Sequence, residues 1–244
     1  NDRLSEFIDE LIAIAGKDKV LTQEDKTRFY RTGIRVGSGV ACAVIFPKNL
    51  LQFWKILEIC ISFDKVIIIQ AANTGLTGGS TPDGDDYDRD VIIINTLYLD
   101  KLVILNDGAQ VLAFPGATLY QLEEKLRPFG RGPHSVIGSS CIGASVVGGV
   151  CNNSGGNLVN RGPAYTELSL YARLNTQGKL ELINHLEVDL GDSPEEILVN
   201  LQSGNFKRND LPKSNKMASD HQYKDRVRDI NASTPARFNS DKRR

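Results

Sequence analysis

The strongest chemical signal is a loop of small residues at positions 71–81, which read AANTGLTGGST and follow directly on an apolar run. Glycine permits positive φ and has no Cβ, so consecutive backbone N–H groups can converge on an anion, and Thr and Ser hydroxyls add donors. The loop therefore predicts a phosphate site; the alternative is a tight connection that packs closely. It lacks the lysine of a P-loop, and no GxGxxG motif opens a helix, which excludes two standard nucleotide sites.

A second stretch of small residues lies at positions 138–156 and reads GSSCIGASVVGGVCNNSGG. Its middle is expected to be a helix with small residues on its buried face, against which a flat ring system or another backbone can lie. The alternative is a helix that simply packs closely through Ala144 and Gly148. If both stretches bind, they clamp one elongated ligand.

Other residues with chemical potential give weaker signals. The acidic run at 83–90 is no EF-hand, because Asp88 stands sixth, where glycine is required, and Ile94 stands twelfth. A solvated loop with Arg89 paired to a neighbouring acid is expected instead. His134 has no visible Ser, Cys or acid partner and is expected to be a structural hydrogen-bonder. The four cysteines show no metal spacing and three have apolar neighbours, which predicts buried free thiols and no metal site.

Composition sets limits on the class of protein. A chain of 244 residues with 41 % hydrophobic residues can bury one large domain or two packed lobes. The formal net charge of −1 gives no general attraction to nucleic acid, although residues 203–244 hold 11 Lys and Arg against 5 Asp and Glu. No apolar stretch approaches the ~20 residues that span a bilayer, and no signal-peptide pattern opens the chain, so a soluble cytoplasmic protein is expected. The first residue is Asn rather than Met, which indicates a processed or excerpted chain.

The first hundred residues predict a mixture of helices and strands, including a βαβ unit between positions 40 and 70. The run at 66–69 lacks polar alternation, which is typical of a strand covered on both faces of a parallel sheet, and a second such run follows. The expected elements are a helix over residues 4–12, a short helix from Thr22, a strand at 40–46, a helix over 50–61, and strands at 65–70 and 91–94.

From about residue 101 the segments become shorter, which predicts a second lobe. The expected elements are strands at 102–105 and 111–114, a helix capped by Thr118 and Gln121, a hairpin with strands at 168–174 and 180–186, and a helix that starts at Ser193 with Glu196 closing a capping box. After about Ser203 the apolar periodicity ends. We therefore expect a first lobe at 1–100 with the phosphate loop, a second lobe at 101–202, and a polar basic tail at 203–244.

Several stretches of the chain resemble a known family. The chain resembles the quinone-dependent D-lactate dehydrogenases in their two FAD-contacting stretches, here AANTGLTGGSTP and PHSVIGSSCIGASVVGGVCNNSGG, and in the run RGPAYTE. The similarity extends over essentially the whole chain and includes YDRDVIIINTLYLDKL. The wider family is that of flavoproteins with the FAD-binding fold of vanillyl-alcohol oxidase and p-cresol methylhydroxylase. The resemblance implies an α+β fold class with two lobes and FAD between them.

The resemblance also implies cofactor-binding residues. The first loop would wrap the pyrophosphate of FAD, and the second stretch would contact the cofactor from the second lobe. Some relatives attach FAD to a histidine of the first loop, but this loop has none, so non-covalent FAD is expected. The implied residues are Ala71, Ala72, Asn73, Thr74, Gly75, Gly79 and Ser80 in the first loop, and Gly138, Ser145 and Gly155 in the second stretch.

The activity implied by the resemblance is the FAD-dependent oxidation of D-lactate to pyruvate, with electrons passed to a membrane quinone. The family's substrate cap, membrane-contacting region and candidate catalytic base would lie beyond Arg244, so no catalytic residue is identified. The isolated chain could therefore be a cofactor-binding fragment with little or no turnover. The implied location is the cytoplasmic side of the bacterial inner membrane, with peripheral contact through that further part.

Two other functions remain open. A cell-wall precursor reductase of the same fold would use NADPH, although the run RGPAYTE speaks against it. A non-enzymatic module would bind partners through its basic tail or have no function. Reduction by NADPH would favour the reductase, and failure of the folded chain to bind flavin would favour the module.

Overall fold

The structure is a computed structural model, and it describes residues 2–133, 143–154, 166 and 168–207. Helices and strands are mixed along the chain, which confirms the predicted α+β content. The elements are α1 (Asp2–Ala15), η1 (Lys17–Lys19), β1 (Val20–Leu21), α2 (Glu24–Thr27), β2 (Ala43–Ile45), α3 (Leu50–Ser62), β3 (Val66–Gln70), β4 (Val91–Asn95), β5 (Leu102–Leu105), η2 (Asn106–Gly108), β6 (Gln110–Ala113), α4 (Leu119–Leu126), η3 (Arg127–Phe129), α5 (Val146–Cys151), β7 (Leu170–Leu174), β8 (Leu180–Asn184) and α6 (Pro194–Ser203).

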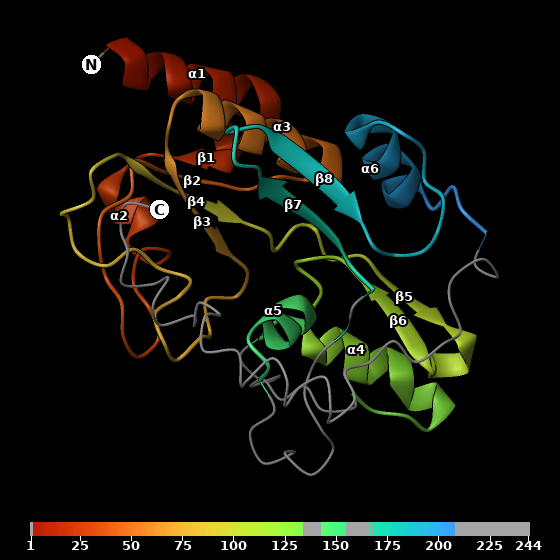
Figure 1. The fold of residues 1–244 in the computed structure, drawn as a ribbon. Helices are drawn as coiled ribbons and strands as arrows, with labels where there is room; N and C mark the ends of the chain where they lie inside the picture. The colour runs from red at the N-terminus through yellow and green to blue at the C-terminus, as the bar shows by residue number, and fades with distance from the viewer. Residues whose placement is uncertain (1, 134–142, 155–165, 167, 208–244) are drawn as a thin grey trace.

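Four strands form the main sheet in the order β1, β2, β4, β3 (Figure 1). β2, β4 and β3 run parallel, which confirms the predicted βαβ unit, and its two strands lie on either side of β4. All five residues of β4 are buried, whereas Ile69 of β3 is 46 % exposed. Cover on both faces is therefore complete for β4 and partial for β3, where Ile67 and Ile68 pack in different core clusters but Ile69 is exposed at the edge of the sheet.

Several predicted elements differ in their bounds by a few residues, and two of them show why. The strand expected at 40–46 is limited to β2, because Val40 instead donates its N–H to the carbonyl of Gly84, 3.0 Å away, in a loop contact. The helix expected from Thr22 begins at Glu24, after Gln23 at the N-cap position. Both differences lie at element ends, where long-range contacts decide the pairing of the backbone.

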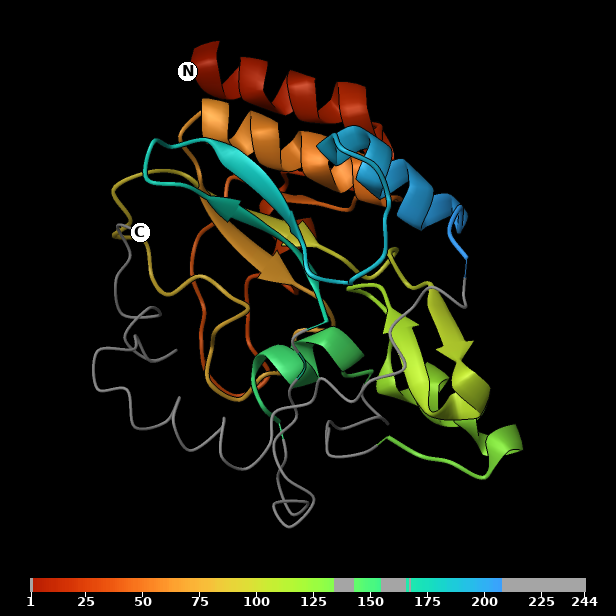
Figure 2. The same cartoon turned by 45° about the vertical axis from the view of Figure 1, so that its right-hand side comes forward.

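The helices α1 and α3 lie side by side and cover one face of the sheet (Figures 1 and 2). The apolar residues of α1 recur at helical spacing, so Phe7 and Leu11 point to one side and are fully buried. They share a core cluster with Ile56 of α3 and with Ile92 and Ile94 of β4. This cluster fixes the position of the sheet from which the first loop begins.

The helix α6 packs against α3, although α6 is the last element along the described chain. Trp54 of α3 shares a core cluster with Leu198 and Leu201 of α6. Figure 2 shows α6 beside α3. The division into lobes near residue 100 stays a prediction. The packing shows that α6, in the predicted second lobe, lies against α3 of the predicted first lobe.

The two short strands expected after residue 101 exist as β5 and β6, which pair antiparallel, and α4 packs on them. The capping box of α4 is also confirmed: Thr118 Oγ1 accepts from the Gln121 N–H at 3.2 Å, and Gln121 Oε1 accepts from the Thr118 N–H at 2.8 Å. The predicted hairpin is formed by β7 and β8, where the Asn175 N–H donates to the carbonyl of Lys179 at 2.9 Å.

Replacing Thr118 by Ala is expected to lower the free energy of unfolding by about 1 kcal/mol, because the substitution leaves an N–H group of the first turn of α4 without its acceptor. Urea denaturation followed by circular dichroism measures the change. Thr22→Ala, at an exposed position outside any helix, is the control and should have almost no effect. Equal losses in the two variants would contradict a contribution from the cap.

The start of α6 differs from its prediction in one detail. Ser193 Oγ accepts from the Glu196 N–H at 3.1 Å as expected. The Glu196 carboxylate, however, accepts from the N–H of Asp192 at 3.0 Å rather than from that of Ser193. Gly191 explains the shift, because a Cβ on it would lie 2.5 Å from Glu196 Cγ, so only glycine lets the carboxylate lie there. The predicted capping box is therefore wrong by one residue.

The helix α6 ends at Ser203, followed by Gly204 with a left-handed φ of 72°. The end agrees with the loss of apolar periodicity in the sequence. Most of the predicted basic tail, from residue 208 onward, lies outside the described residues. Within the part of the chain that the structure describes, no helix has the length and apolar character needed to cross a membrane.

The three cysteines in the described ranges, Cys42, Cys60 and Cys151, are free thiols, as predicted. Cys60 is buried and Cys42 is partly buried, but Cys151 is exposed at the end of the short helix α5, so burial was wrongly expected there. Burial raises the pKa of Cys42 to about 11 and that of Cys60 to about 12.

Of the three cysteines that the structure describes, thiol alkylation near neutral pH is expected to modify Cys151 first, Cys42 more slowly and Cys60 last. Burial raises the pKa of Cys151 as well, but its side chain is the most exposed of the three. The thiolate is the reactive form, and a raised pKa leaves less of it at any pH below that value. Peptide mass spectrometry over a time course of iodoacetamide labelling gives the order. Labelling of Cys60 as fast as Cys151 in the folded chain would contradict the burial of α3 against the sheet.

Candidate functional site

The loop at residues 71–80 leaves the carboxyl end of β3, at the edge of the sheet. Its middle residues, Gly75, Leu76 and Thr77, are exposed. Within the described residues, the backbone N–H groups of 72–77 donate no hydrogen bond to another residue. A Cβ built on Gly75 would meet nothing within 4 Å. Among the described residues, the loop therefore has a run of backbone donors without an acceptor, and such donors can bind an anion.

Two of the predicted residues shape the loop by bonding to each other. Ser80 Oγ donates to Asn73 Oδ1 at 2.8 Å and so links the end of the loop to its beginning. Asn73 has a left-handed φ of 55°, and its Nδ2 donates to the carbonyl of Thr32 at 2.8 Å. Asn tolerates this conformation better than most residues, since its side chain can bond locally. Asn73 thus ties the loop to a segment about forty residues earlier in the chain.

That earlier segment, at residues 31–39, is part of the site that sequence reasoning missed. A Cβ built on Gly37, where φ is 94°, would lie 2.2 Å from Thr81 Oγ1. A Cβ on Gly39 would lie 2.5 Å from the carbonyl oxygen of Gly84. Only glycine lets the Thr81 hydroxyl approach at position 37 and the Gly84 backbone at position 39 so closely. The signal in the sequence was three glycines, at positions 33, 37 and 39, within the run RTGIRVGSG.

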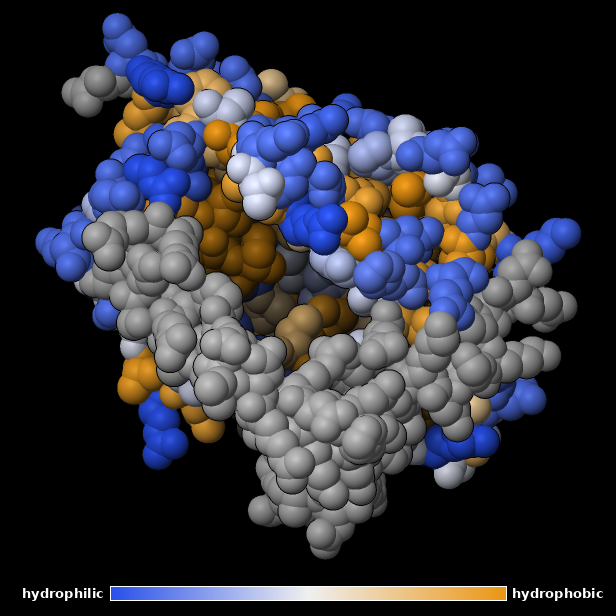
Figure 3. Space-filling view, viewed as in Figure 1, coloured by the Kyte–Doolittle hydropathy of each residue, from blue (hydrophilic) through white to orange (hydrophobic). Residues whose placement is uncertain are grey.

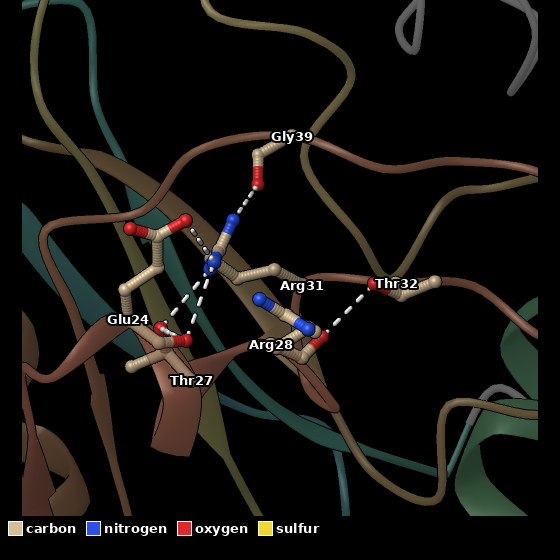
Figure 4. Close-up of polar contacts among 6 residues, drawn as sticks. All are labelled: Glu24, Thr27, Arg28, Arg31, Thr32 and Gly39. Atoms are coloured by element: carbon tan, nitrogen blue, oxygen red, sulfur yellow. Dashed lines mark hydrogen bonds and ion pairs between the residues drawn. The ribbon is translucent and has the colours of Figure 1, made fainter.

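Arg31 holds this segment in place (Figure 4). Its Nη1 donates to the carbonyl of Gly39 at 2.7 Å and its Nε to Thr27 Oγ1 at 3.0 Å, while Nη2 lies 3.4 Å from the carbonyl of Glu24. The Arg31 side chain is only 14 % exposed. Because the planar guanidinium bonds both to α2 and to Gly39 at the end of the segment, it connects α2 rigidly to the glycine-rich turn.

The second stretch approaches the first loop from the other side. Gly143 has a φ of 84°, and a Cβ built on it would lie 3.9 Å from the Cβ of Ala72. Ser145 is buried and caps α5, since its Oγ accepts from the Gly148 N–H at 3.1 Å. The expected helix exists but is short and begins at Val146. The close-packing alternative is right only for the burial of Ala144, which packs in the core cluster of α4 but lies before the helix, whereas Gly148 is only partly buried.

A hollow lies between these parts. Figure 3 shows it in the middle of the face seen in Figure 1, next to α5, and the coloured surface in and above it includes apolar residues, drawn in orange. An apolar recess beside a few convergent polar groups is typical of a small-molecule site. The arrangement suits a ligand that has both a flat apolar part and an anionic part.

Seven of the predicted site residues lie in the first loop, and the eighth, Ser145, lies at the start of α5, two residues after the Gly143 that approaches Ala72. Gly138, Gly155 and His134 lie outside the described residues. Binding by any of these residues stays a prediction, because the geometry shows their placement and not their ligand.

The acidic run after the loop is a surface feature. Arg89 pairs with Asp64 at 2.9 Å and with Asp88 at 3.1 Å, which confirms the expected ion pair. The hydrogen bond to Asp64 is the main cause that raises the pKa of Arg89 above its usual range. Among the residues that the structure describes, no group of three His, Cys, Asp or Glu side chains could hold a metal ion.

Comparison with known proteins gives similarities in sequence and in fold. A family model described as an FAD binding domain matches residues 41–177. The chain is 59 % identical over 235 residues to the quinone-dependent D-lactate dehydrogenase of Escherichia coli K12, over 96 % of this chain and 41 % of that protein. It is 54 % identical over 238 residues to that of Haemophilus influenzae, over 98 % of this chain and 42 % of that protein. The chain thus spans about two fifths of the length of these curated relatives.

Among solved structures, p-cresol methylhydroxylase with substrate bound superposes with a TM-score of 0.56 at 15 % identity, over 75 % of this chain and 35 % of that one. Identity this low supports a common fold alone. The predicted resemblance is confirmed by the sequence matches, and the predicted α+β fold of the p-cresol methylhydroxylase type is confirmed by this superposition.

Proposed function

The chain belongs to the family of FAD binding domains, and from this we propose that it binds FAD without a covalent bond at the site built by the first loop and the stretch before α5. The diphosphate would accept hydrogen bonds from the loop, with Ala71, Ala72, Asn73, Thr74, Gly75, Gly79 and Ser80 around it. Gly138, Ser145 and Gly155 would contact the cofactor from the second lobe. The apolar hollow would take the flat ring system.

The observation that carries this proposal is the run of open N–H groups at residues 72–77. The loop has neither Lys nor Arg, so the charge of a diphosphate would be met by backbone donors. A hydrogen bond to a charged group contributes about 1.5–3 kcal/mol, and several of them together can hold a diphosphate. A histidine that could form a covalent link to FAD is absent from the loop sequence.

We further propose that the protein oxidises D-lactate to pyruvate and passes the electrons to a quinone. The support is the similarity to two relatives that carry this function in their names. Bound FAD would supply the hydride acceptor. The residues of this chain would hold the diphosphate, orient the ring system against the hollow and keep water away from its buried side. No catalytic base is proposed among the described residues.

A location on the cytoplasmic side of the bacterial inner membrane, by peripheral contact, is part of the proposal. It is supported by the bacterial relatives and by the quinone in their names, since respiratory quinones reside in the membrane. The positive excess of residues 203–244 is compatible with nearby anionic lipid.

Anaerobic addition of substrate to the FAD-loaded chain tests the activity. D-lactate is expected to bleach the flavin absorption, while L-lactate and NADPH leave it unchanged. Reduction by NADPH and not by D-lactate would contradict the assignment and favour a reductase. A flavin band that no 2-hydroxy acid bleaches would limit this chain to cofactor binding, which is the alternative function.

A further inference from the structure

We propose that Gln70 and Asn95, two buried amides outside the predicted set, are positioning residues that hold the first loop in its FAD-binding shape. The inference rests on the proposed function and concerns how the site is built. Neither residue needs to touch the cofactor, since both would act through the backbone of the loop.

The two amides occupy equivalent ends of neighbouring strands. Gln70 is the last residue of β3, Asn95 is the last residue of β4, and the two are paired in the parallel register. Each is only 1 % exposed. The residues before them are apolar in both strands, so the two amides are the first polar side chains at the carboxyl ends of these strands, where the loop begins.

Gln70 joins the end of the loop to the segment before it. Its Nε2 donates to the carbonyl of Ser80 at 2.8 Å and to the carbonyl of Tyr30 at 2.8 Å. Both N–H groups of the amide are therefore used. Tyr30 directly precedes Arg31, which braces the glycine-rich turn, so one side chain connects the two backbones that form this wall of the site.

Asn95 joins the start of the loop to the same network. Its Nδ2 donates to the carbonyl of Ala71 at 3.1 Å and to Gln70 Oε1 at 3.1 Å, and its Oδ1 accepts from the Leu97 N–H at 3.1 Å. The pair thus grips the loop at both ends, through Ala71 and Ser80. A loop fixed at both ends samples fewer conformations before the ligand arrives, which lowers the entropy cost of binding.

The chemistry of the pair is specific. Carbonyl oxygens face both amide nitrogens, so an ionised carboxylate of the same shape would place acceptor against acceptor. An apolar side chain would leave buried carbonyls without a donor. If the two positions served only for packing, an isoleucine would be enough, as at positions 67–69 and 92–94 of the same strands.

The test compares Gln70→Met with wild type in the full chain of 244 residues. Met keeps the length of the side chain and removes its donors. The dissociation constant of FAD is expected to rise about 10- to 100-fold, as for the loss of one or two hydrogen bonds to a charged group. The dissociation constant of riboflavin, which has no diphosphate, should stay near its wild-type value. The phosphorus NMR signals of bound FAD should shift, because the diphosphate would meet a displaced loop.

Ile92→Ala is the matched control, since Ile92 is fully buried in β4 and belongs to the cluster with α1 rather than to the amide network. It should lower stability at least as much while leaving FAD affinity and the phosphorus signals unchanged. Asn95→Asp, which keeps the shape of the side chain, is the second variant and should behave as Gln70→Met does.

Unchanged FAD affinity and phosphorus signals in folded variants would overturn the inference. In that case the proposed function would still stand, provided that the wild-type chain binds FAD. A wild-type chain that binds no FAD would overturn both. If the variants fail to fold, proton NMR of the wild-type chain tests the inference instead. The side-chain amide protons of Gln70 and Asn95 should exchange slowly with solvent in the chain without FAD, and fast exchange would also overturn the inference.

Discussion

Replacing Gly75 by Asp is expected to weaken FAD binding about 100-fold or more while the chain stays folded. Gly75 is exposed, and a Cβ on it would meet nothing within 4 Å, so the new side chain has room. Its carboxylate would face the diphosphate, and two unit charges ~4 Å apart repel by about 4 kcal/mol at an effective dielectric constant of ~20. Titration of the chain with FAD, followed by quenching of flavin fluorescence, measures the dissociation constant.

Two controls separate charge from size. Gly75→Asn has the shape of the Asp variant without its charge and should lose much less affinity, whereas Thr176→Asp adds the same charge to an exposed hairpin turn and should lose none. The loss in Gly75→Asp should also shrink as salt screens the repulsion. Equal losses for Asp and Asn at Gly75 would point to steric hindrance, and no loss in either would mean that the diphosphate does not bind at this loop.

Trp54→Ala is expected to lower the free energy of unfolding by about 3–5 kcal/mol, as for other large side chains removed from a packed core. Trp54 is 5 % exposed and joins α3 to the cluster of α6. Since small domains are stable by only about 5–15 kcal/mol, such a loss would leave the chain close to unfolding. Urea denaturation followed by circular dichroism is the measurement, because the substitution removes the one tryptophan of the chain.

Val199→Ala is the control for this prediction, since Val199 lies on α6 but is 47 % exposed. It should cost well under 1 kcal/mol, as most exposed substitutions do. A loss below about 1 kcal/mol in Trp54→Ala would contradict the account in which α6 packs on α3 as part of one core. Wild-type tryptophan fluorescence and circular dichroism should also report a single, coincident transition.

The elements that the sequence predicts well are those with a local signal. The opening helix follows from the spacing of its apolar residues, and the capping box of α4 from Thr118 and Gln121 alone. The edge position of β3 could not be predicted, because β3 reads VIIIQ and β4 reads VIIIN, so nothing local distinguishes the two strands. Which of the two strands becomes central depends on how the chain crosses over through α3, and contacts between residues far apart in the sequence decide that.

The same distinction applies to the site. The first loop stands out because its small residues are contiguous in the sequence. The contact of Gly37 with Thr81 joins residues far apart in the chain, and nothing in the sequence around Arg31 shows that its side chain bonds to the carbonyl of Gly39. Gln70 and Asn95 look like common polar ends of strands, and only the folded chain shows that their amides meet at the two ends of the loop.

The central claim is that this chain binds FAD, without a covalent bond, through the open N–H groups of residues 72–77. The most direct measurement is the visible spectrum of the purified chain after incubation with FAD and desalting, followed by acid precipitation. The account predicts a flavin band that is retained with the folded chain and released into the supernatant by acid. A folded chain that retains no flavin, or a flavin that stays with the precipitate, would contradict it.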